Sequence, residues 1–272
     1  MRRGKKWLRS YGPWALVTGA SDGIGREFAR TLAEAGFDLI LVARRKDRLE
    51  ELAQELAERF DATTRVIEAD LADAEHVARV IETTRSIDIG LLVASAGFGT
   101  SGSLIDTPVE DELSMLDVNC RAVLSLSHEF ADRFVRQGRG GLVLLSSIVA
   151  FQGVPRSANY AATKAYVQSL AEGLRVELKP LGVDVIAAAP GPVSSGFAKR
   201  ANMQMGAAQN AADVPAATMS SLGRRTTVRP GRLSKLLGFA LSTLPRWGRV
   251  RVMTLIMGGM TKHQEDPSVQ VP

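Results

Sequence analysis

The sequence predicts a doubly wound, three-layer α/β fold, with a central parallel β-sheet between two layers of helices and a helical extension at the C-terminus. Two observations support this prediction: apolar and amphipathic segments alternate regularly, and a glycine-rich turn follows the first apolar segment. From residue 13 to about 190, short continuous apolar runs alternate with amphipathic stretches. Such runs are typical of strands covered on both faces, and their alternation with helices predicts right-handed crossovers between parallel strands.

The elements follow in a regular order along the chain. The predicted strands are the apolar runs at residues 15–18, 38–43, 65–69, 90–94, 141–146 and 183–189. The predicted helices between them cover residues 24–36, 46–59, 73–85, 109–137 and 157–179. The helical period is clear at Leu49, Leu52 and Leu56, which share one face while acidic residues cover the other.

The pattern breaks after Pro190. Residues 191–212 are mostly small or polar and show no steady period, so this segment is either a disordered loop or a mobile lid. Beyond it we expect a helix near 213–222, a short strand near 225–229, an apolar helix near 231–244 and a frayed tail at 262–272. We expect one domain for residues 1–272, with a core at about 13–197 and a substrate lid and C-terminal extension at about 198–261.

The charge balance is basic, with 34 Lys and Arg against 29 Asp and Glu and a net charge of +5. The excess is concentrated at residues 2–9 and 224–251. A nucleic-acid surface would interleave such cations with aromatic residues along one face, and the sequence shows no such pattern. We therefore expect no nucleic-acid partner and favour a solvated tail and a basic C-terminal surface. A weak contact with an anionic membrane surface is the alternative.

The cysteine and histidine content argues against a disulfide-bonded protein and against a metal site. The only cysteine, Cys120, cannot form an intramolecular disulfide, and His76, His128 and His263 lie far apart in the sequence. We therefore expect no metal site, and this usage fits the reducing cytosol. No apolar run approaches the ~20 residues that are needed to cross a bilayer.

A glycine-rich loop, T-G-A-S-D-G-I-G at residues 18–25, joins the first strand to the first helix. Gly19 permits a turn that side chains would block, Gly23 lets the backbone approach a pyrophosphate, and Gly25 lets the helix pack closely. The free N–H groups at the start of a helix favour phosphate binding. The loop therefore predicts a dinucleotide site, and a glycine-rich turn without a ligand is the alternative.

The second strand ends in three cations, Arg44, Arg45 and Lys46, with no acid at its tip. An acid there would bind the adenosine ribose of NAD, whereas an arginine accommodates the additional phosphate of NADP. We therefore predict NADP(H), with Arg44 as the principal phosphate ligand. In the alternative interpretation the cations begin a solvated helix, and Asp22 places an acid in the loop where a base would help.

With Tyr160 and Lys164 added to this loop, residues 13–197 resemble the short-chain dehydrogenase/reductase family. The motifs of that family are matched in order by residues 18–25, Asp70, Asn119, Ser147, Tyr160, Lys164 and 190–195, where Ser195 stands for the usual Thr. The resemblance implies a Rossmann fold and a homodimer or homotetramer. It also implies a cofactor site formed by Gly19, Ser21, Gly23, Ile24, Gly25, Arg44, Asp70, Leu71, Ala96, Tyr160, Lys164, Pro190, Val193 and Ser195.

One family motif is altered. Where the family has N-N-A-G, this chain has A-S-A-G at residues 94–97, so neither asparagine is present to tie the strand end to its neighbour. Ser95 is the candidate to replace one of these contacts.

The spacing of Tyr160 and Lys164 has a chemical reason. On a helix the two side chains lie one turn apart on the same face, and a fixed ammonium favours the tyrosinate. We therefore expect Lys164 to lower the pKa of Tyr160, whose ordinary value is about 10, so that the phenol acts as a general acid or base. Ser147 would hydrogen-bond the substrate oxygen, and Asn119 would hold a water that links Lys164 to solvent.

The sequence thus predicts an NADP(H)-dependent oxidoreductase that interconverts a carbonyl and a secondary alcohol. The segment around the first strand resembles the branch with long-chain 3-ketoacyl reductases and 17β-hydroxysteroid dehydrogenases, which implies an apolar small-molecule substrate. The alternative is a nucleotide-binding sensor or scaffold that has this fold and no catalytic activity.

Overall fold

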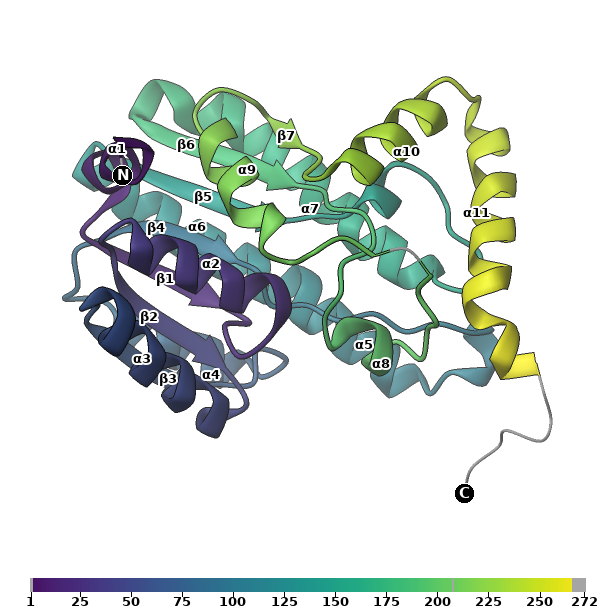
Figure 1. Cartoon of the computed structure of the whole chain (residues 1–272), viewed down its shortest axis with the longest axis horizontal. Coiled ribbons are helices and arrows are strands. Elements are labelled where there is room, and N and C mark those ends of the chain that lie inside the picture. Colours follow the sequence, from purple (N-terminus) through teal and green to yellow (C-terminus); the bar gives the residue numbers. More distant parts are fainter. Residues whose placement is uncertain (1, 207, 266–272) are drawn as a thin grey trace.

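The computed structural model describes residues 2–206 and 208–265, and it confirms the predicted fold class. Within these residues, seven parallel strands form one sheet in the order β3-β2-β1-β4-β5-β6-β7 (Figure 1). The strands are β1 (Trp14–Thr18), β2 (Asp38–Ala43), β3 (Thr64–Glu68), β4 (Ile89–Ala94), β5 (Gly140–Leu145), β6 (Val183–Ala188) and β7 (Thr227–Val228). Because neighbouring strands are parallel, their carboxyl ends meet at one edge of the sheet.

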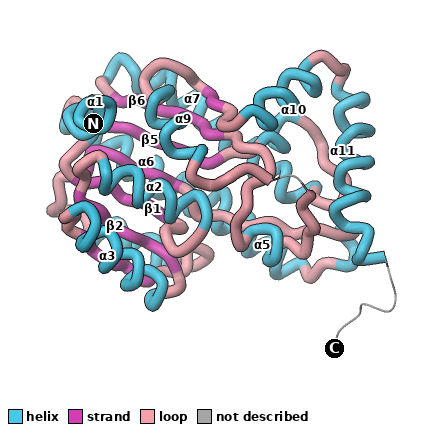
Figure 2. Tube along the Cα trace, in the orientation of Figure 1, coloured by secondary structure: helices cyan, strands magenta, loops and turns pink. Residues whose placement is uncertain are grey.

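Helices cover both faces of the sheet (Figures 1 and 2). On one face lie α2 (Gly23–Glu34), α3 (Lys46–Phe60) and α9 (Asp213–Ser221), and on the other lie α4 (Ala74–Thr83), α6 (Ala122–Gln137) and α7 (Ala158–Leu178). The central strand shows why the apolar runs are continuous. Ala15 and Val17 belong to the core on the α2 side, whereas Leu16 belongs to the core on the opposite side.

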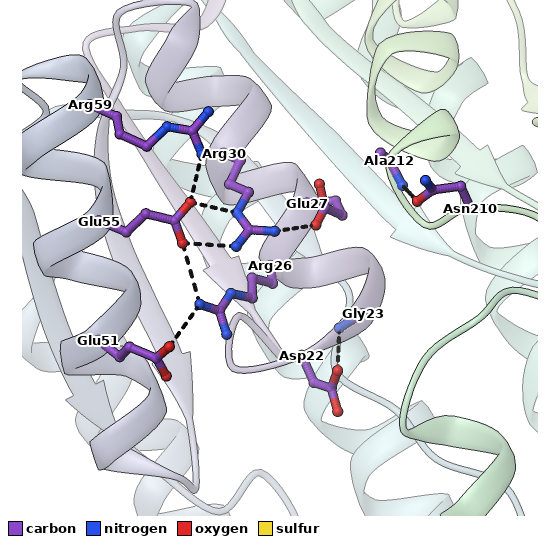
Figure 3. A network of polar contacts seen from close by, with 10 residues as sticks. All are labelled: Asp22, Gly23, Arg26, Glu27, Arg30, Glu51, Glu55, Arg59, Asn210 and Ala212. Carbon is purple, nitrogen blue, oxygen red and sulfur yellow. Dashed lines mark hydrogen bonds and ion pairs between the residues drawn. The ribbon is translucent and has the colours of Figure 1, made fainter.

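A network of ion pairs joins α2 to α3 (Figure 3). Glu55 accepts hydrogen bonds from Arg30 at 2.8 and 2.9 Å, from Arg59 at 3.0 Å and from Arg26 at 3.3 Å. The hydrogen bonds from Arg30 are the largest cause of a Glu55 pKa lowered to about 2. The network fixes α3 against the helix that begins at the glycine loop.

The basic N-terminal segment is a helix and not the solvated tail that we predicted. In α1 (Arg2–Tyr11), Trp7 and Leu8 pack against the core, and Tyr11 is buried. The Tyr11 hydroxyl donates a 2.8 Å hydrogen bond to Asp184. The aromatic and leucine side chains therefore anchor a segment whose composition is dominated by cations.

The long helix predicted at 109–137 is interrupted. It consists of α5 (Val109–Leu116), a wider π-helical turn at Asp117–Arg121, and α6. Asn119 lies buried in this turn. Such single wide turns occur often at functional sites because they reorient a side chain within a helix.

The C-terminal part is more ordered than predicted. The 191–212 segment includes α8 (Phe197–Arg200). Its two arms are joined by two backbone hydrogen bonds: the Ser194 N–H donates to the Gln209 carbonyl at 3.0 Å, and the Gln209 N–H donates to the Pro192 carbonyl at 2.9 Å. The predicted helices at 213–222 and 231–244 are confirmed as α9 and α10 (Arg232–Ser242), and the short strand as β7. A further helix, α11 (Arg246–Thr261), was not predicted; in the tail, Lys262–Glu265 forms a 3-10 turn and 266–272 lies outside the described residues.

Short 3-10 helices occur at Leu104–Asp106, Ile148–Phe151 and Lys179–Leu181. Among the helices of the described residues, none has both the length and the apolar character needed to cross a membrane.

Candidate active site

The carboxyl ends of the strands open into a cavity of about 870 Å³. In doubly wound sheets ligands bind at this edge, where the strand order reverses between the first and fourth strands. Every residue that the sequence predicts for cofactor binding or catalysis lines the cavity, except Asn119. The structure thus brings together residues that are up to 176 positions apart in the chain, from Gly19 to Ser195.

The glycine loop lies against the end of β4. Gly19 has a φ of +68°, and a Cβ at this position would lie 2.9 Å from the Ala96 backbone, so only glycine fits. The Thr18 hydroxyl accepts hydrogen bonds of 3.0 Å from the N–H groups of Ser95 and Ala96. These backbone groups tie the two strand ends together, so the contact does not depend on the asparagines that residues 94–95 lack.

At the phosphate end of the cavity, Asp22 caps α2 by accepting a 2.7 Å hydrogen bond from the Gly23 N–H. Arg45 donates to the Ser21 hydroxyl at 3.1 Å and lies 3.4 Å from the Asp22 carboxylate. The acid in the loop is therefore paired with a cation that the sequence did not assign to the site. Arg44 lies 3.8 Å from Asp70 and is 54% exposed, so its guanidinium faces the cavity with few constraints.

A further cation, Arg200, reaches the cavity from α8. Its guanidinium lies 3.9 Å above the ring of Phe98. Burial and the positive charge of Arg44 lower the pKa of Arg200. Two guanidinium groups therefore approach the same part of the cavity from opposite segments. No sequence pattern pointed to Arg200, because residues 191–212 have no regular period.

The Tyr160 hydroxyl lies at the junction of β5 and α7, where Ser147 follows the strand. Burial raises the pKa of Tyr160 to about 12, although its hydrogen bond with Ser147 acts in the opposite direction. The expected lowering of this pKa by Lys164 is thus not seen. Lys164 instead donates a 2.9 Å hydrogen bond to the Leu145 carbonyl, and its amino group is 5.8 Å from the centre of the Tyr160 ring.

Lys164 is itself buried, and burial lowers its pKa to about 8. Burial in this low-dielectric surrounding disfavours the charged forms, which are the tyrosinate of Tyr160 and the ammonium of Lys164. This raises the pKa of Tyr160 and lowers that of Lys164, so the expected acidification of the phenol does not occur. Both groups keep their protons at neutral pH.

Asn119 connects the segment after β4 to α7 by hydrogen bonds. Its side-chain oxygen accepts from the Phe98 N–H at 3.1 Å, and its amide donates to the Phe98 carbonyl at 2.8 Å and to Thr163 at 3.0 Å. These bonds hold the segment after β4 against α7, next to Lys164. That Asn119 holds a water linking Lys164 to solvent stays a prediction.

The other half of the cavity is apolar. The Phe197 ring lies 5.2 Å from the Tyr160 ring, and α10 and α11 close the far side. The remaining lining of this half is Val149, Val154, Met203, Met205, Leu237, Leu241, Met253, Ile256, Met257 and Met260. Methionine side chains adapt to irregular shapes, so this half suits a bulky apolar molecule. Sequence analysis assigned none of these residues, because a core position and a cavity wall have the same apolar pattern.

Polar contacts hold this apolar half in place. The Ser234 hydroxyl of α10 accepts a 2.8 Å hydrogen bond from the Gly191 N–H, and Arg156 donates a 2.8 Å hydrogen bond to Thr261 of α11. Gly191 directly follows Pro190, whose carbonyl accepts from the Ile148 N–H at 3.0 Å. The two C-terminal helices are thus connected to the loop that carries Ser147.

Known proteins share this architecture. A family model described as short chain dehydrogenase matches residues 13–206. The 7beta-hydroxysteroid dehydrogenase of Clostridium sardiniense is 35% identical over 65% of this chain and 67% of its own length. A structure from a study of 7beta-hydroxysteroid dehydrogenase stereoselectivity superposes with a TM-score of 0.84 at 26% identity, covering 91% of this chain and 98% of the other.

A short-chain dehydrogenase from Sphingobium yanoikuyae in complex with NADPH superposes with a TM-score of 0.76 at 30% identity, over 85% of this chain and 94% of the other. The family match spans most of the chain, and the motifs that carried the resemblance lie together in one cavity. The chain therefore belongs to the short chain dehydrogenase family of oxidoreductases.

Proposed function

We propose that this protein is an NADP(H)-dependent oxidoreductase that interconverts a carbonyl and a secondary alcohol on a bulky apolar substrate, such as a steroid or a long 3-ketoacyl chain. The observation that carries the proposal is the position of Tyr160 and Ser147. They lie where the glycine-loop half of the cavity meets the apolar half. The relative from Clostridium sardiniense, a 7beta-hydroxysteroid dehydrogenase, supports the steroid class of substrate.

The cofactor half fits a dinucleotide. Gly19 and Gly23 both have positive φ values, so their backbone leaves room for a pyrophosphate at the start of α2. Asp70 and Leu71 line the same half and would hold the adenine end. Bound NADPH supplies the hydride, and the residues of this chain supply position, charge and a proton.

The preference for NADP(H) rests on three arginines. Arg44, Arg45 and Arg200 all line the cofactor half, and the second strand has no acid at its tip. Burial lowers the pKa of Arg200, and the positive charge of Arg44 lowers it further. A phosphate dianion between the two guanidinium groups would offset their mutual repulsion. The NADPH complex of the Sphingobium yanoikuyae relative agrees with this choice.

The proton path starts at the Tyr160 phenol. Because its pKa is about 12, the hydroxyl keeps its proton at neutral pH and donates it to the oxygen of a bound carbonyl as negative charge develops there. Ser147 donates a second hydrogen bond to that oxygen. Lys164, with a pKa of about 8, holds a proton that it releases readily and returns it toward Tyr160. These roles describe reduction; oxidation runs the same steps in reverse.

A Tyr160→Phe variant tests the proposal. It should reduce ketones by NADPH at least about 10²-fold more slowly, because the proton donor is lost. NADPH binding, followed by fluorescence, should persist, since the ring remains. Tyr166→Phe is the matched control, as this tyrosine lies on the same helix outside the cavity. Turnover by Tyr160→Phe at the rate of the control would disprove the mechanism.

We also propose that the protein is a homodimer that pairs through α5, α6 and α7. Six large apolar side chains are exposed on these helices, with exposed fractions of 37% to 76%: Val109, Leu113, Leu116, Leu124, Tyr166 and Val176. Large apolar side chains exposed on neighbouring helices are typical of an association site.

A further inference from the structure

The C-terminal part of the chain has an unusual distribution of charge. Residues 214–264 contain nine of the 34 Lys and Arg residues and none of the 29 Asp and Glu residues. The rest of the chain therefore has more acids than bases. The net positive charge of the protein comes entirely from this segment, which folds as α9, β7, α10 and α11.

The outer face of the α10–α11 hairpin combines these cations with large apolar side chains. Leu236 and Phe239 of α10 are 66% and 70% exposed, and Trp247 and Leu255 of α11 are 65% and 79% exposed. The exposed cations on the same two helices are Arg232, Lys235, Arg246 and Arg251.

Helical spacing places both kinds of side chain on one side of each helix. Leu236 follows Arg232 by four residues, and Trp247, Arg251 and Leu255 recur every four residues along α11. The Arg251 guanidinium lies 5.3 Å from the centre of the Trp247 ring. In Figure 1 the two helices form the end of the molecule that lies farthest from α1.

The inner face of the same hairpin is a different surface. Leu237, Leu241, Met253 and Met257 point the other way and line the apolar half of the cavity. The outer apolar side chains are therefore not required to build the site. Large apolar side chains that gather with cations on one exposed face are typical of an interaction surface.

We propose that the outer face of the α10–α11 hairpin docks on an anionic membrane surface. Basic side chains near such a surface are attracted to the lipid headgroups, and Trp, Phe and Leu on the same face enter the headgroup boundary. A symmetric contact with a second copy of this chain would instead set one acid-free cationic face against another, which like charges oppose. Docking does not depend on the proposed enzymatic activity.

The test is cosedimentation of the full-length protein with phosphatidylcholine vesicles, with and without phosphatidylglycerol, at low and high salt. The protein should pellet with the anionic vesicles at low salt and remain in solution with the neutral ones. Arg232→Glu combined with Lys235→Glu should weaken partitioning by about thirtyfold or more, because two cations near the surface are lost. Phe239→Ser combined with Trp247→Ser should weaken it by a similar factor.

Matched controls lie outside the hairpin. Arg85 and Arg136 are exposed cations with side chains 67% and 77% exposed, and Leu181 is an exposed apolar residue. Arg85→Glu with Arg136→Glu, and Leu181→Ser, should bind vesicles as the unaltered protein does. Circular dichroism checks that each variant is folded.

Tryptophan fluorescence gives an independent measurement. Anionic vesicles should shift the emission to shorter wavelength, and the shift should disappear in Trp247→Phe, since Trp7 and Trp14 are partly buried elsewhere. Equal binding to neutral and anionic vesicles, or no binding at all, would overturn the proposal. So would a loss of dimer in light scattering for Phe239→Ser with Trp247→Ser while vesicle binding stays intact, because the face would then contact a second copy.

Discussion

Lys164 carries a charge that its surroundings disfavour. Its amino group is buried beside β5 with one hydrogen bond to the Leu145 carbonyl, and burial lowers its pKa to about 8 from an ordinary value near 10.5. Burial of this lysine therefore costs stability, and its place in the proposed proton path gives that cost a functional reason.

A Lys164→Met variant lacks the buried ammonium, so the difference in unfolding free energy between the unaltered protein and this variant should depend on pH. The folded-state pKa lies below the unfolded one, so the cost is present in full below pH 8 and disappears by about pH 10.5. The free energy of unfolding of the unaltered protein should therefore rise by roughly 3 kcal/mol relative to the variant between pH 7 and pH 10.5. Urea denaturation measures it, with the exposed Lys179→Met as control. A pH-independent difference would contradict the shift.

Arg44 is the residue that should decide the choice of cofactor. Arg44→Asp should weaken NADPH binding by about tenfold to a hundredfold, the value of one or two charge-assisted hydrogen bonds, and should improve NADH binding. Titration of both nucleotides measures the effect. Lys46→Asp, two positions further and outside the cavity lining, is the control. If Arg44→Asp keeps its preference for NADPH, Arg45 and Arg200 carry the recognition instead.

Residue identities in the site were predictable where a family motif gave them, as for Tyr160, Ser147 and the glycine loop. Their electrostatics were not predictable, since the pKa of Tyr160 depends on how deeply the chain buries it. Arg200 could not be found from the sequence, because it approaches the site through a segment without a periodic pattern. The methionines could not be found either, because an apolar pattern does not distinguish a cavity wall from the core.

At the scale of elements, the α2–α3 network fixes the helix that begins at the glycine loop. Glu55 is its centre, and the hydrogen bonds from Arg30 lower its pKa to about 2. The folded-state pKa lies below the unfolded one, so this contribution to stability is present above about pH 4.5 and is lost as the pH falls through about 2.

A Glu55→Gln variant should lose about 1 to 2 kcal/mol of unfolding free energy at pH 7, because Arg26, Arg30 and Arg59 lose their shared partner. The deficit should shrink as the pH is lowered from about 4.5 toward 2. Thermal denaturation across this range checks the prediction. Glu58→Gln, on the same helix and outside the network, is the control, and an equal deficit in both variants would speak against the network.

Element positions followed well from apolar patterns, because a strand covered on both faces must be apolar throughout. The π-helical turn at Asp117–Arg121 was not predicted from the apolar pattern, since one wide turn leaves the period of the flanking helices almost unchanged. Helix α1 was missed because its cations outnumber the three side chains, Trp7, Leu8 and Tyr11, that anchor it.

At the scale of the whole molecule, the sheet and its helices form a scaffold, and the α10–α11 hairpin completes the cavity. The alternation of segments predicted the scaffold correctly. It could not predict the hairpin's position, which depends on tertiary contacts such as Gly191 with Ser234 and Arg156 with Thr261. The single-domain boundary stays a prediction.

The proposed homodimer can be tested at the same scale. Leu124→Glu places a charge on the exposed apolar face of α6 and should convert the dimer to a monomer, because a buried unpaired carboxylate opposes association. Light scattering coupled to gel filtration measures the mass. Leu181→Glu is the control, and a Leu124→Glu protein that remains dimeric would place the interface elsewhere.

Helix α8 touches both compartments of the cavity. Its first residue, Phe197, lies beside Tyr160 at the apolar half, and its last, Arg200, lies over the ring of Phe98 near Arg44. Because α8 has only four residues, a ligand that restrains one end of the helix also restrains the other end. If cofactor and substrate bind in these two halves, we expect each to raise the affinity for the other, and thermodynamic linkage requires the two effects to be equal in size.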